Sequence, residues 1–401
     1  MRKDLLAFIT LAFSLSLPSS GLPQSATSGL TSKSPQLDLK ALADKANHGF
    51  PEAQYQLGIA YRYGFGVEKS EYEAMRWYRL AANSGYTSAQ NDLAYLYETG
   101  PDGLRDMREA VKWYQRAAIY GNATAQFNLG RLYLYGLGVQ RSNDEALRWM
   151  QKSVDLNCTL ALASLGLMYA TGQGVPRNFP EALKLAKKAV KQHSPEGEAV
   201  LGILYVDGLG IPKNLAEGAK LLKRAAQNGS ANGQYRLGTL YAAGNGVERN
   251  PQEAARLFRL AADQGHPGAQ VLLGQIYEFG QGVPMDRKEA VAWYRKAANQ
   301  GDIDSATQLG TILLSGQGVD KNIEEAMKWL TMAADNGDAY AQFSLAGLYA
   351  SGTGVQRDLQ KAYSLFTLAG SMFDVRKQLN QIQSQLSRED LAARQPTTSQ
   401  E

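Results

Sequence analysis

Histidine and cysteine, which often carry metal binding or nucleophilic catalysis, are scarce in this sequence. Its 401 residues include three histidines, His48, His193 and His266, and one cysteine, Cys158. The histidines lie too far apart in the sequence to suggest a shared metal or catalytic site, and no base can be assigned to activate Cys158. An intermolecular disulfide at Cys158 stays open beside the simpler interpretation of an inert thiol. We therefore expect no catalysis, no cofactor and no metal.

Aromatic and arginine side chains give a better functional lead, because both residue types are enriched where proteins bind one another. Ten of them fall at variable positions on the outward side of predicted helices, where we expect a partner-binding face. The alternative is that several of these aromatic side chains pack between neighbouring helices. The ten residues are Tyr55, Arg62, Tyr63, Tyr95, Phe127, Arg131, Tyr135, Tyr235, Arg236 and Phe279.

The elements that position these residues recur with a step of 36. Leu57 returns in nine copies from Leu57 to Leu345, and Gly64 returns in nine copies from Gly64 to Gly352, without insertion or deletion. Ala53, Leu57 and Tyr61 lie at helical spacing and predict the buried face of a first helix. Gly58 and its copies lie on that face and would let a second helix approach closely. Gly64 is expected to end the first helix in the left-handed conformation.

The second helix of each repeat has a clear start signal. Nine Ser, Asp or Asn residues, from Ser70 to Asp358, are good N-caps, and Glu follows three residues later in the first eight copies. This spacing predicts a capping box. Gly85 and its copies end the second helix, but repeats 3 and 4 carry Asn157 and His193 there, so those turns are expected to differ. Each repeat is thus two antiparallel helices of about 12 residues, stable only when stacked on its neighbours.

The second helices also carry a column of basic residues. Read alone, it would suggest a nucleic acid or a membrane surface as the partner. The capping glutamates lie three residues before these bases and should pair with them, and the net charge of the chain is only +4. We therefore expect a solvated face and no nucleic-acid partner. The column consists of Arg76, Lys112, Arg148, Lys184, Lys220, Arg256 and Lys328.

The chain ends indicate export and capping. Arg2 and Lys3 precede an apolar run from Leu5 to Leu17, which predicts a signal peptide over residues 1–21 rather than a membrane anchor, because a span needs about 20 apolar residues. We expect no integral span after its removal. The other predicted segments are a flexible leader (22–35), a half repeat that caps the N-terminal end (36–52), nine repeats (53–370), a capping helix (371–392) and a disordered tail (393–401).

The repeated pattern resembles the Sel-1-like repeat family. It reads Ala-x-x-x-Leu-Gly-x-x-Tyr-x-x-Gly-x-Gly-Val and then Ala-x-x-Trp, as in Ala125, Leu129, Gly130, Tyr133 and Trp149. Repeat 2 departs from it with Gly100-Pro101-Asp102-Gly103. The resemblance implies an all-α, right-handed α/α superhelical solenoid of nine 36-residue repeats with capping helices at both ends. It also implies that the first helices line the concave side.

Members of this family typically serve as adaptor scaffolds or exported interaction proteins. The expected function is therefore an exported scaffold that binds proteins or peptides, periplasmic or secreted, with no small-molecule substrate. One cysteine-rich bacterial subgroup is associated with binding and hydrolysis of β-lactams, which leaves a cell-wall-ligand or hydrolase-like protein as the alternative. That subgroup staples its repeats with disulfides, for which Cys158 alone cannot serve. A place in the lumen of a eukaryotic secretory pathway also stays open.

Overall fold

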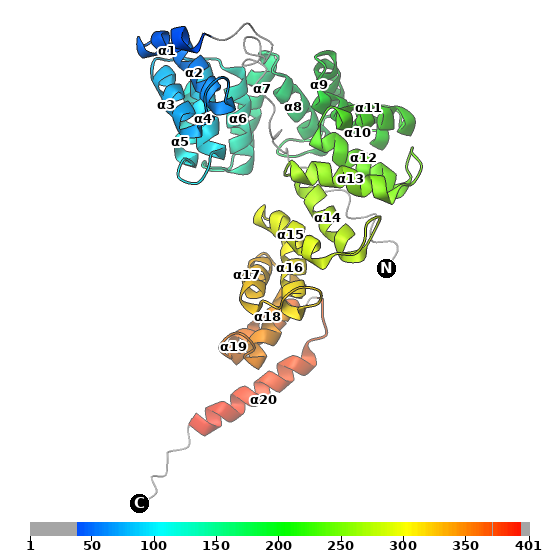
Figure 1. Cartoon of the computed structure of the whole chain (residues 1–401). Helices are drawn as coiled ribbons and strands as arrows, with labels where there is room; N and C mark the ends of the chain where they lie inside the picture. Colours follow the sequence, from blue (N-terminus) through cyan, green and yellow to red (C-terminus); the bar gives the residue numbers. More distant parts are fainter. Residues whose placement is uncertain (1–37, 371, 394–401) are drawn as a thin grey trace, which may run out of the picture. The chain divides into compact units, whose positions relative to one another are not determined.

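The computed structural model describes residues 38–370 and 372–393. These residues form twenty α-helices and no strand (Figure 1). The helices are α1 (Leu39–Asn47), α2 (Pro51–Tyr63), α3 (Glu71–Asn83), α4 (Thr87–Thr99), α5 (Met107–Ile119), α6 (Ala123–Tyr135), α7 (Asn143–Asp155), α8 (Thr159–Thr171), α9 (Phe179–Lys191), α10 (Pro195–Asp207), α11 (Leu215–Gln227), α12 (Ala231–Ala243), α13 (Pro251–Asp263), α14 (Pro267–Phe279), α15 (Arg287–Asn299), α16 (Ile303–Ser315), α17 (Ile323–Asp335), α18 (Ala339–Ser351), α19 (Leu359–Ala369) and α20 (Arg376–Ala393).

The helices pair in consecutive helix–turn–helix repeats, as the 36-residue step predicts. Each even-numbered helix from α2 to α18 is the first helix of a repeat, and the odd-numbered helix after it is the second. Contacts are densest within these pairs, and each second helix also packs against the next first helix. The chain divides into two compact units, whose described parts are residues 38–236 and 237–393, and each contains stacked repeats of a solenoid.

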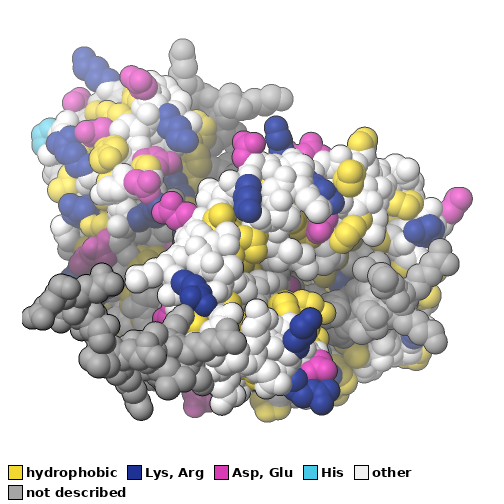
Figure 2. Space-filling model, turned by 90° about the horizontal axis from the view of Figure 1, so that it is seen from below, with side chains coloured by type: hydrophobic (Ala, Val, Ile, Leu, Met, Phe, Trp, Pro, Cys, Tyr) yellow, Lys and Arg dark blue, Asp and Glu magenta, His cyan; other side chains and the backbone are white. Residues whose placement is uncertain are grey.

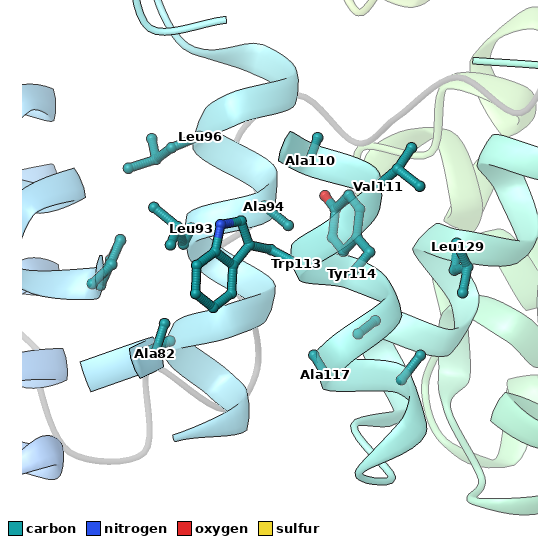
Figure 3. Close-up of a cluster of buried hydrophobic side chains, with 14 of the residues drawn as sticks. Ala82, Leu93, Ala94, Leu96, Ala110, Val111, Trp113, Tyr114, Ala117 and Leu129 are labelled. Carbon is teal, nitrogen blue, oxygen red and sulfur yellow. The ribbon is translucent and has the colours of Figure 1, made fainter. Parts of the chain in front are cut away.

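The core of each repeat is formed by the positions that recur most strictly. In repeats 1 to 3, alanines and leucines such as Ala89 and Leu93 are fully buried, and Trp113 and Tyr114 join the same cluster. Figure 3 shows Trp113 reaching toward Leu93 on the neighbouring helix. Gly58 lies so close to the second helix that a Cβ there would come within 2.5 Å of the Tyr78 ring. The small residue therefore permits the close approach that the sequence predicts.

The starts of the second helices confirm the predicted N-caps. The side chain of Ser70 accepts a hydrogen bond from the backbone N–H of Glu73, and all nine copies cap their helices in the same way. The second bond of the predicted capping box is wrong, because the glutamate side chain does not accept from the backbone N–H of the cap residue. The backbone N–H of Ser70 donates to the carbonyl of Tyr61 at 2.9 Å, and the other cap residues bond the first helix likewise, so the glutamates are left to pair elsewhere.

The turns confirm most of the glycine predictions. Eight of the nine glycines that end the first helices are left-handed; the exception is Gly100, with φ −61° and ψ 169°, in the repeat with the divergent turn. The expectation that the turns at Asn157 and His193 differ is wrong. Both residues adopt φ near +57° and +58° and so follow the glycine path, because the backbone bonds of the turn require it.

Buried glutamines join consecutive repeats, which the sequence reasoning did not anticipate. Gln90 donates from Nε2 to the carbonyl of Ala82, at the end of the preceding second helix, over 3.0 Å. The same bond recurs from Gln54, Gln126, Gln234, Gln270 and Gln342. Each bond satisfies a carbonyl at the last turn of a helix and thereby fixes how one repeat sits on the next.

The terminal helices cover the ends of the repeat stack. At the C-terminal end, Val375 and Ile382 are buried and Leu379 and Leu386 are partly buried against Phe366 and its neighbours, which is the apolar stripe expected of a capping helix. At the other end, Leu42 and Ala46 of α1 pack on the first repeat. The predicted signal peptide and leader lie outside the described residues, as does most of the predicted tail. Across the described segments, no helix has the length and apolar character needed to cross a membrane.

Candidate functional site

The candidate site lies on the first helices of repeats 1 to 3, α2, α4 and α6, within residues 38–236. In this unit, first helices of successive repeats come close enough to touch one another, as α6, α8 and α10 do. Side chains on the outward side of a first helix therefore meet those of the next first helix. We refer to a place in the repeat by its residue number in repeat 1, so that position 62 holds Arg62, Glu98 and Glu278 in repeats 1, 2 and 7.

A buried hydrogen-bond network crosses the three first helices. The Tyr55 hydroxyl donates to Asp92 Oδ2 over 2.9 Å, and Asn91 Nδ2 donates to Asp92 Oδ1 over 2.9 Å. Asn128 Nδ2 in turn donates to Asn91 Oδ1 over 3.2 Å. All four side chains are at most 6 % exposed. Burial raises the pKa of Asp92, while the positive charge of Arg62 and the two donated bonds oppose that rise.

A buried ion pair lies beside this network. Arg131 on α6 pairs with Glu98 on α4, and the two side chains are only 5 % and 7 % exposed. The hydroxyl of Tyr114, from the second helix α5, donates to the other carboxylate oxygen of Glu98 over 3.0 Å. Because both charges are removed from water, their partners must stay in place for the fold to tolerate them. The pair therefore acts as a rigid support for the surface above it.

The accessible part of the site is formed by tyrosines and one arginine. The Arg62 guanidinium lies 5.4 Å from the centroid of the Tyr63 ring and 4.8 Å from that of Tyr95. All three residues are half-buried. Tyr135, also half-buried, has its hydroxyl 3.4 Å from Gln173 Nε2, which donates to it. This arrangement can recognise a partner by stacking and hydrogen bonding, and it contains no paired nucleophile and base.

The structure separates the ten predicted site residues into three groups. Arg62, Tyr63, Tyr95 and Tyr135 are half-buried and can be reached, and Phe279 is 63 % exposed. The expectation that all ten present a surface is corrected for the remaining five, which are 4–6 % exposed because they pack between consecutive first helices. These buried residues are Tyr55, Phe127, Arg131, Tyr235 and Arg236.

Sequence reasoning missed the residues that hold this surface in place, namely Asp92, Asn91, Asn128 and Glu98. One signal could have found part of the set. Position 78 holds Tyr in three repeats only, and the same three repeats are those with a charged residue at position 62. In repeats 2 and 7 the structure joins the two positions directly, as Tyr114 with Glu98 and Tyr294 with Glu278. A tyrosine at position 78 of the second helix therefore predicts a charged residue at position 62 of the first helix.

Five of the seven residues in the basic column of the second helices pair as expected, whereas Glu325 pairs with Arg295 instead of Lys328. Arg76 lies 3.2 Å from Glu73, and Lys112, Arg148, Lys184 and Arg256 form equivalent exposed pairs. Figure 2 shows Lys and Arg interspersed with Asp and Glu on the face turned to the viewer. Cys158 is partly exposed at the N-cap of α8. Within the described segments, no three His, Cys, Asp or Glu side chains are grouped to hold a metal ion.

Comparison with known proteins places the repeats in a family. The Sel1 repeat matches nine consecutive segments: 51–86, 87–119, 123–158, 159–194, 195–230, 231–266, 267–302, 303–338 and 339–372. A search of curated proteins gives no match.

Two solved structures are similar in sequence along most of their length. One is a protective antigen present in uropathogenic Escherichia coli strains, with 32 % identity over 83 % of this chain and 79 % of that chain, and a TM-score of 0.46. The other is a Sel1 repeat protein from Oxalobacter formigenes, with 30 % identity over 78 % of this chain and 90 % of that chain, and the same TM-score of 0.46. With nine matched repeats, the chain belongs to the Sel1 repeat family.

Proposed function

We propose that this protein is an exported, non-catalytic scaffold that binds a protein or peptide partner on the first helices of repeats 1 to 3. The observation that carries the proposal is the placement of Arg62 against the rings of Tyr63 and Tyr95, where all three side chains stay partly accessible. Tyrosine and arginine side chains in such a setting contribute most of the energy in many protein interfaces.

Rigidity below the surface supports the same function. Tyr95 stands on α4, which the Asp92 network ties to α2 and the Glu98–Arg131 pair ties to α6. A partner that binds here would not have to order the three helices first. Pre-organisation of this kind lowers the entropic cost of binding, so a modest surface gives useful affinity. A purely structural function would not need the rings and the guanidinium to remain accessible.

The compartment is inferred from the sequence. The basic start, the apolar run from Leu5 to Leu17 and the small residues after it support export, to the periplasm or outside the cell. The same signal would direct a eukaryotic protein to the secretory lumen. In either compartment the partner is a protein or peptide, and neither a cofactor nor a small-molecule substrate is required.

The test is the simultaneous replacement of Tyr63, Tyr95 and Tyr135 with Ala. The triple variant should keep the helical circular dichroism of the wild type, because none of the three rings is fully buried. It should lose cross-linked capture of the partner from the exported fraction. The loss should be nearly complete, since truncation of a single hot-spot residue often costs about 2 kcal/mol or more.

A matched control removes three aromatic rings that lie away from the site. Phe50, Tyr72 and Tyr120 are 59 %, 62 % and 75 % exposed in the same unit, and their replacement with Ala should leave capture unchanged. Undiminished capture by the first variant, or equal loss in both, would refute binding at this surface.

A further inference from the structure

One adjacency recurs along the first helices and gives a rule for which positions meet. The side chain at position 62 of one repeat contacts the side chain at position 59 of the next. In repeats 1 and 2 this contact is Arg62 over the Tyr95 ring, at 4.8 Å, and in repeats 2 and 3 it is the Glu98–Arg131 ion pair. Two chemically different contacts follow the same geometry, so the rule belongs to the repeat and not to the side chains.

In repeats 2 and 3, the glutamate at position 62 has a partner for each of its two carboxylate oxygens. One carboxylate oxygen of Glu98 accepts from the Tyr114 hydroxyl, and the other binds the guanidinium of Arg131. The tyrosine comes from the second helix of the same repeat. The arginine comes from the first helix of the next repeat.

Repeat 7 has the same glutamate and tyrosine, Glu278 and Tyr294, but the arginine is missing from the next repeat. The Tyr294 hydroxyl donates to Glu278 Oε2 over 2.7 Å, as Tyr114 does to Glu98. The next repeat, however, has Thr311 at position 59, and its hydroxyl donates to the carbonyl of Thr307 over 2.8 Å. Glu278 is half-buried and forms no ion pair with any residue that the structure describes. Its carboxylate therefore has one oxygen available to a partner.

The surroundings of Glu278 favour a cation. The sequences of α14 and α16, the first helices of this repeat and the next, contain no Lys or Arg. A positive charge that pairs with Glu278 would therefore have to come from outside these two helices.

An exposed aromatic side chain follows Glu278 directly in the chain. Phe279 follows Glu278 on the same helix and is 63 % exposed. In repeat 1, the charged end of Arg62 lies 5.4 Å from the ring at the next position, Tyr63. A cation held by Glu278 would therefore approach the Phe279 ring, and a guanidinium suits both contacts because it binds carboxylates through its fork and stacks on aromatic faces.

We propose that Glu278, Tyr294 and Phe279 form a site for an arginine side chain presented by a segment of a partner protein. The site is separate from the tyrosines of repeats 1 to 3, although it rests on the proposed protein-binding function. The arginine of the partner takes the place at Glu278 that Arg131 takes at Glu98. Glu98 thus binds an arginine of its own chain, whereas Glu278 would bind an arginine of the partner protein.

The geometry can be tested without a partner through the variant Thr311→Arg. An arginine at this exposed position should pair with Glu278 and raise the melting temperature by roughly 2 °C. The rise should disappear in the Thr311→Arg, Glu278→Gln double variant. Thr311→Gln serves as the control for side-chain length. An equal rise with and without Glu278 would overturn the assigned adjacency.

Binding is tested with defined peptides and the full chain. The probe is acetyl-Leu-Arg-Leu-amide, and its citrulline counterpart has the same shape without the charge. The arginine peptide should bind the wild type measurably by NMR titration, and the citrulline peptide at least about tenfold more weakly, as expected for loss of a charged hydrogen bond. Glu278→Gln and Thr311→Arg should each weaken binding of the arginine peptide by a similar factor.

The controls distinguish this site from the proposed function as a whole. Glu248→Gln removes an exposed carboxylate in the same unit and should leave peptide binding unchanged. If Glu278→Gln binds the arginine peptide like the wild type, or if arginine and citrulline peptides bind equally, the site is refuted. If the arginine site is refuted but the Tyr63, Tyr95 and Tyr135 triple variant still loses partner capture, the proposed function stands without the arginine site.

Discussion

The first helices of repeats 1 to 3 and those of repeats 7 to 9 share the same positions but use their charges differently. In the first set, Asp92 and Glu98 are bonded within the chain, to Tyr55 and Arg131 among others. In the second set, Glu278 has its tyrosine but no arginine. One repeat geometry thus yields an ion pair that stabilises the stack in one region and, in the other, a half-buried carboxylate with no ion-pair partner among the described residues. The difference depends on a single residue of the next repeat, Arg131 or Thr311.

The second helices show the opposite trend. In repeats 1 to 3 the capping glutamates pair within their own helix, as Glu73 does with Arg76 at 3.2 Å. In repeats 7 and 8, Glu289 and Glu325 pair instead with an arginine of the preceding second helix, as in Arg295 to Glu325 at 2.8 Å. The N-terminal repeats are therefore tied by charges through their first helices, and the C-terminal repeats through their second helices.

The largest expected effect comes from one substitution made at both equivalent sites. Glu98→Gln leaves the buried guanidinium of Arg131 without its counter-charge and should destabilise the protein by about 3–5 kcal/mol. Glu278→Gln keeps an oxygen that accepts from Tyr294 and removes no ion pair, so its effect should stay within about 0.5 kcal/mol. Urea unfolding of the full chain, followed by circular dichroism, measures both. Similar losses of stability in the two variants would contradict the distinction between the ion-paired Glu98 and the unpaired Glu278.

The second-largest expected effect is a loss of folding stability at acidic pH. His266 is the N-cap of α14; its Nδ1 accepts from the backbone N–H of Ala269 over 3.1 Å, and burial lowers its pKa to about 4. An unfolded histidine titrates near 6.5, so the unfolded chain binds more protons between these values. Stability should fall as the pH decreases from about 6.5 toward 4, by roughly 3 kcal/mol in all. In residues 38–236 the corresponding caps, such as Asn122 and Ser194, do not titrate in this range.

The control for the acid effect is His266→Asn. Asparagine supplies an acceptor for the same cap bond and does not titrate, so the difference between the two proteins isolates His266. Thermal melts at pH 7.5 and 4.5 should show a smaller fall for the variant than for the wild type. Equal falls would mean that His266 does not set the acid sensitivity.

The sequence predicts the repeats far better than the site, and the reason is physical. Leu57 and Gly64 recur because every repeat must pack its own two helices, and that periodicity is visible in a single chain. Whether Tyr55 or Arg131 is accessible depends instead on how far each repeat rotates against the next, which no single repeat encodes. The Glu98–Arg131 contact joins residues 33 apart whose adjacency exists only in the stack. The missed Asp92 network has the same origin.

The smallest expected effect lies in the turns between repeats. The turns after α13, α15 and α17 have left-handed glycines, Gly265, Gly301 and Gly337, whereas residues 38–236 include His193 at φ +58° and Asn157 at +57°. His193 is exposed, and a Cβ at the equivalent Gly229 would meet no atom within 4 Å, so its side chain gains no packing there. His193→Gly should therefore raise stability by about 1 kcal/mol, since a left-handed residue with a Cβ costs roughly 1–2 kcal/mol.

Asn157→Gly should gain only a few tenths of a kcal/mol, because asparagine tolerates the left-handed conformation better than histidine does. Urea unfolding at neutral pH, where neither substitution changes a titrating group in the core, should rank His193→Gly above Asn157→Gly and both above the wild type. If His193→Gly is no more stable than the wild type, the loss of chain entropy that glycine brings offsets the relief of backbone strain at this turn. The two turns would then be equivalent to the glycine turns of residues 237–393 in energy as well as in shape.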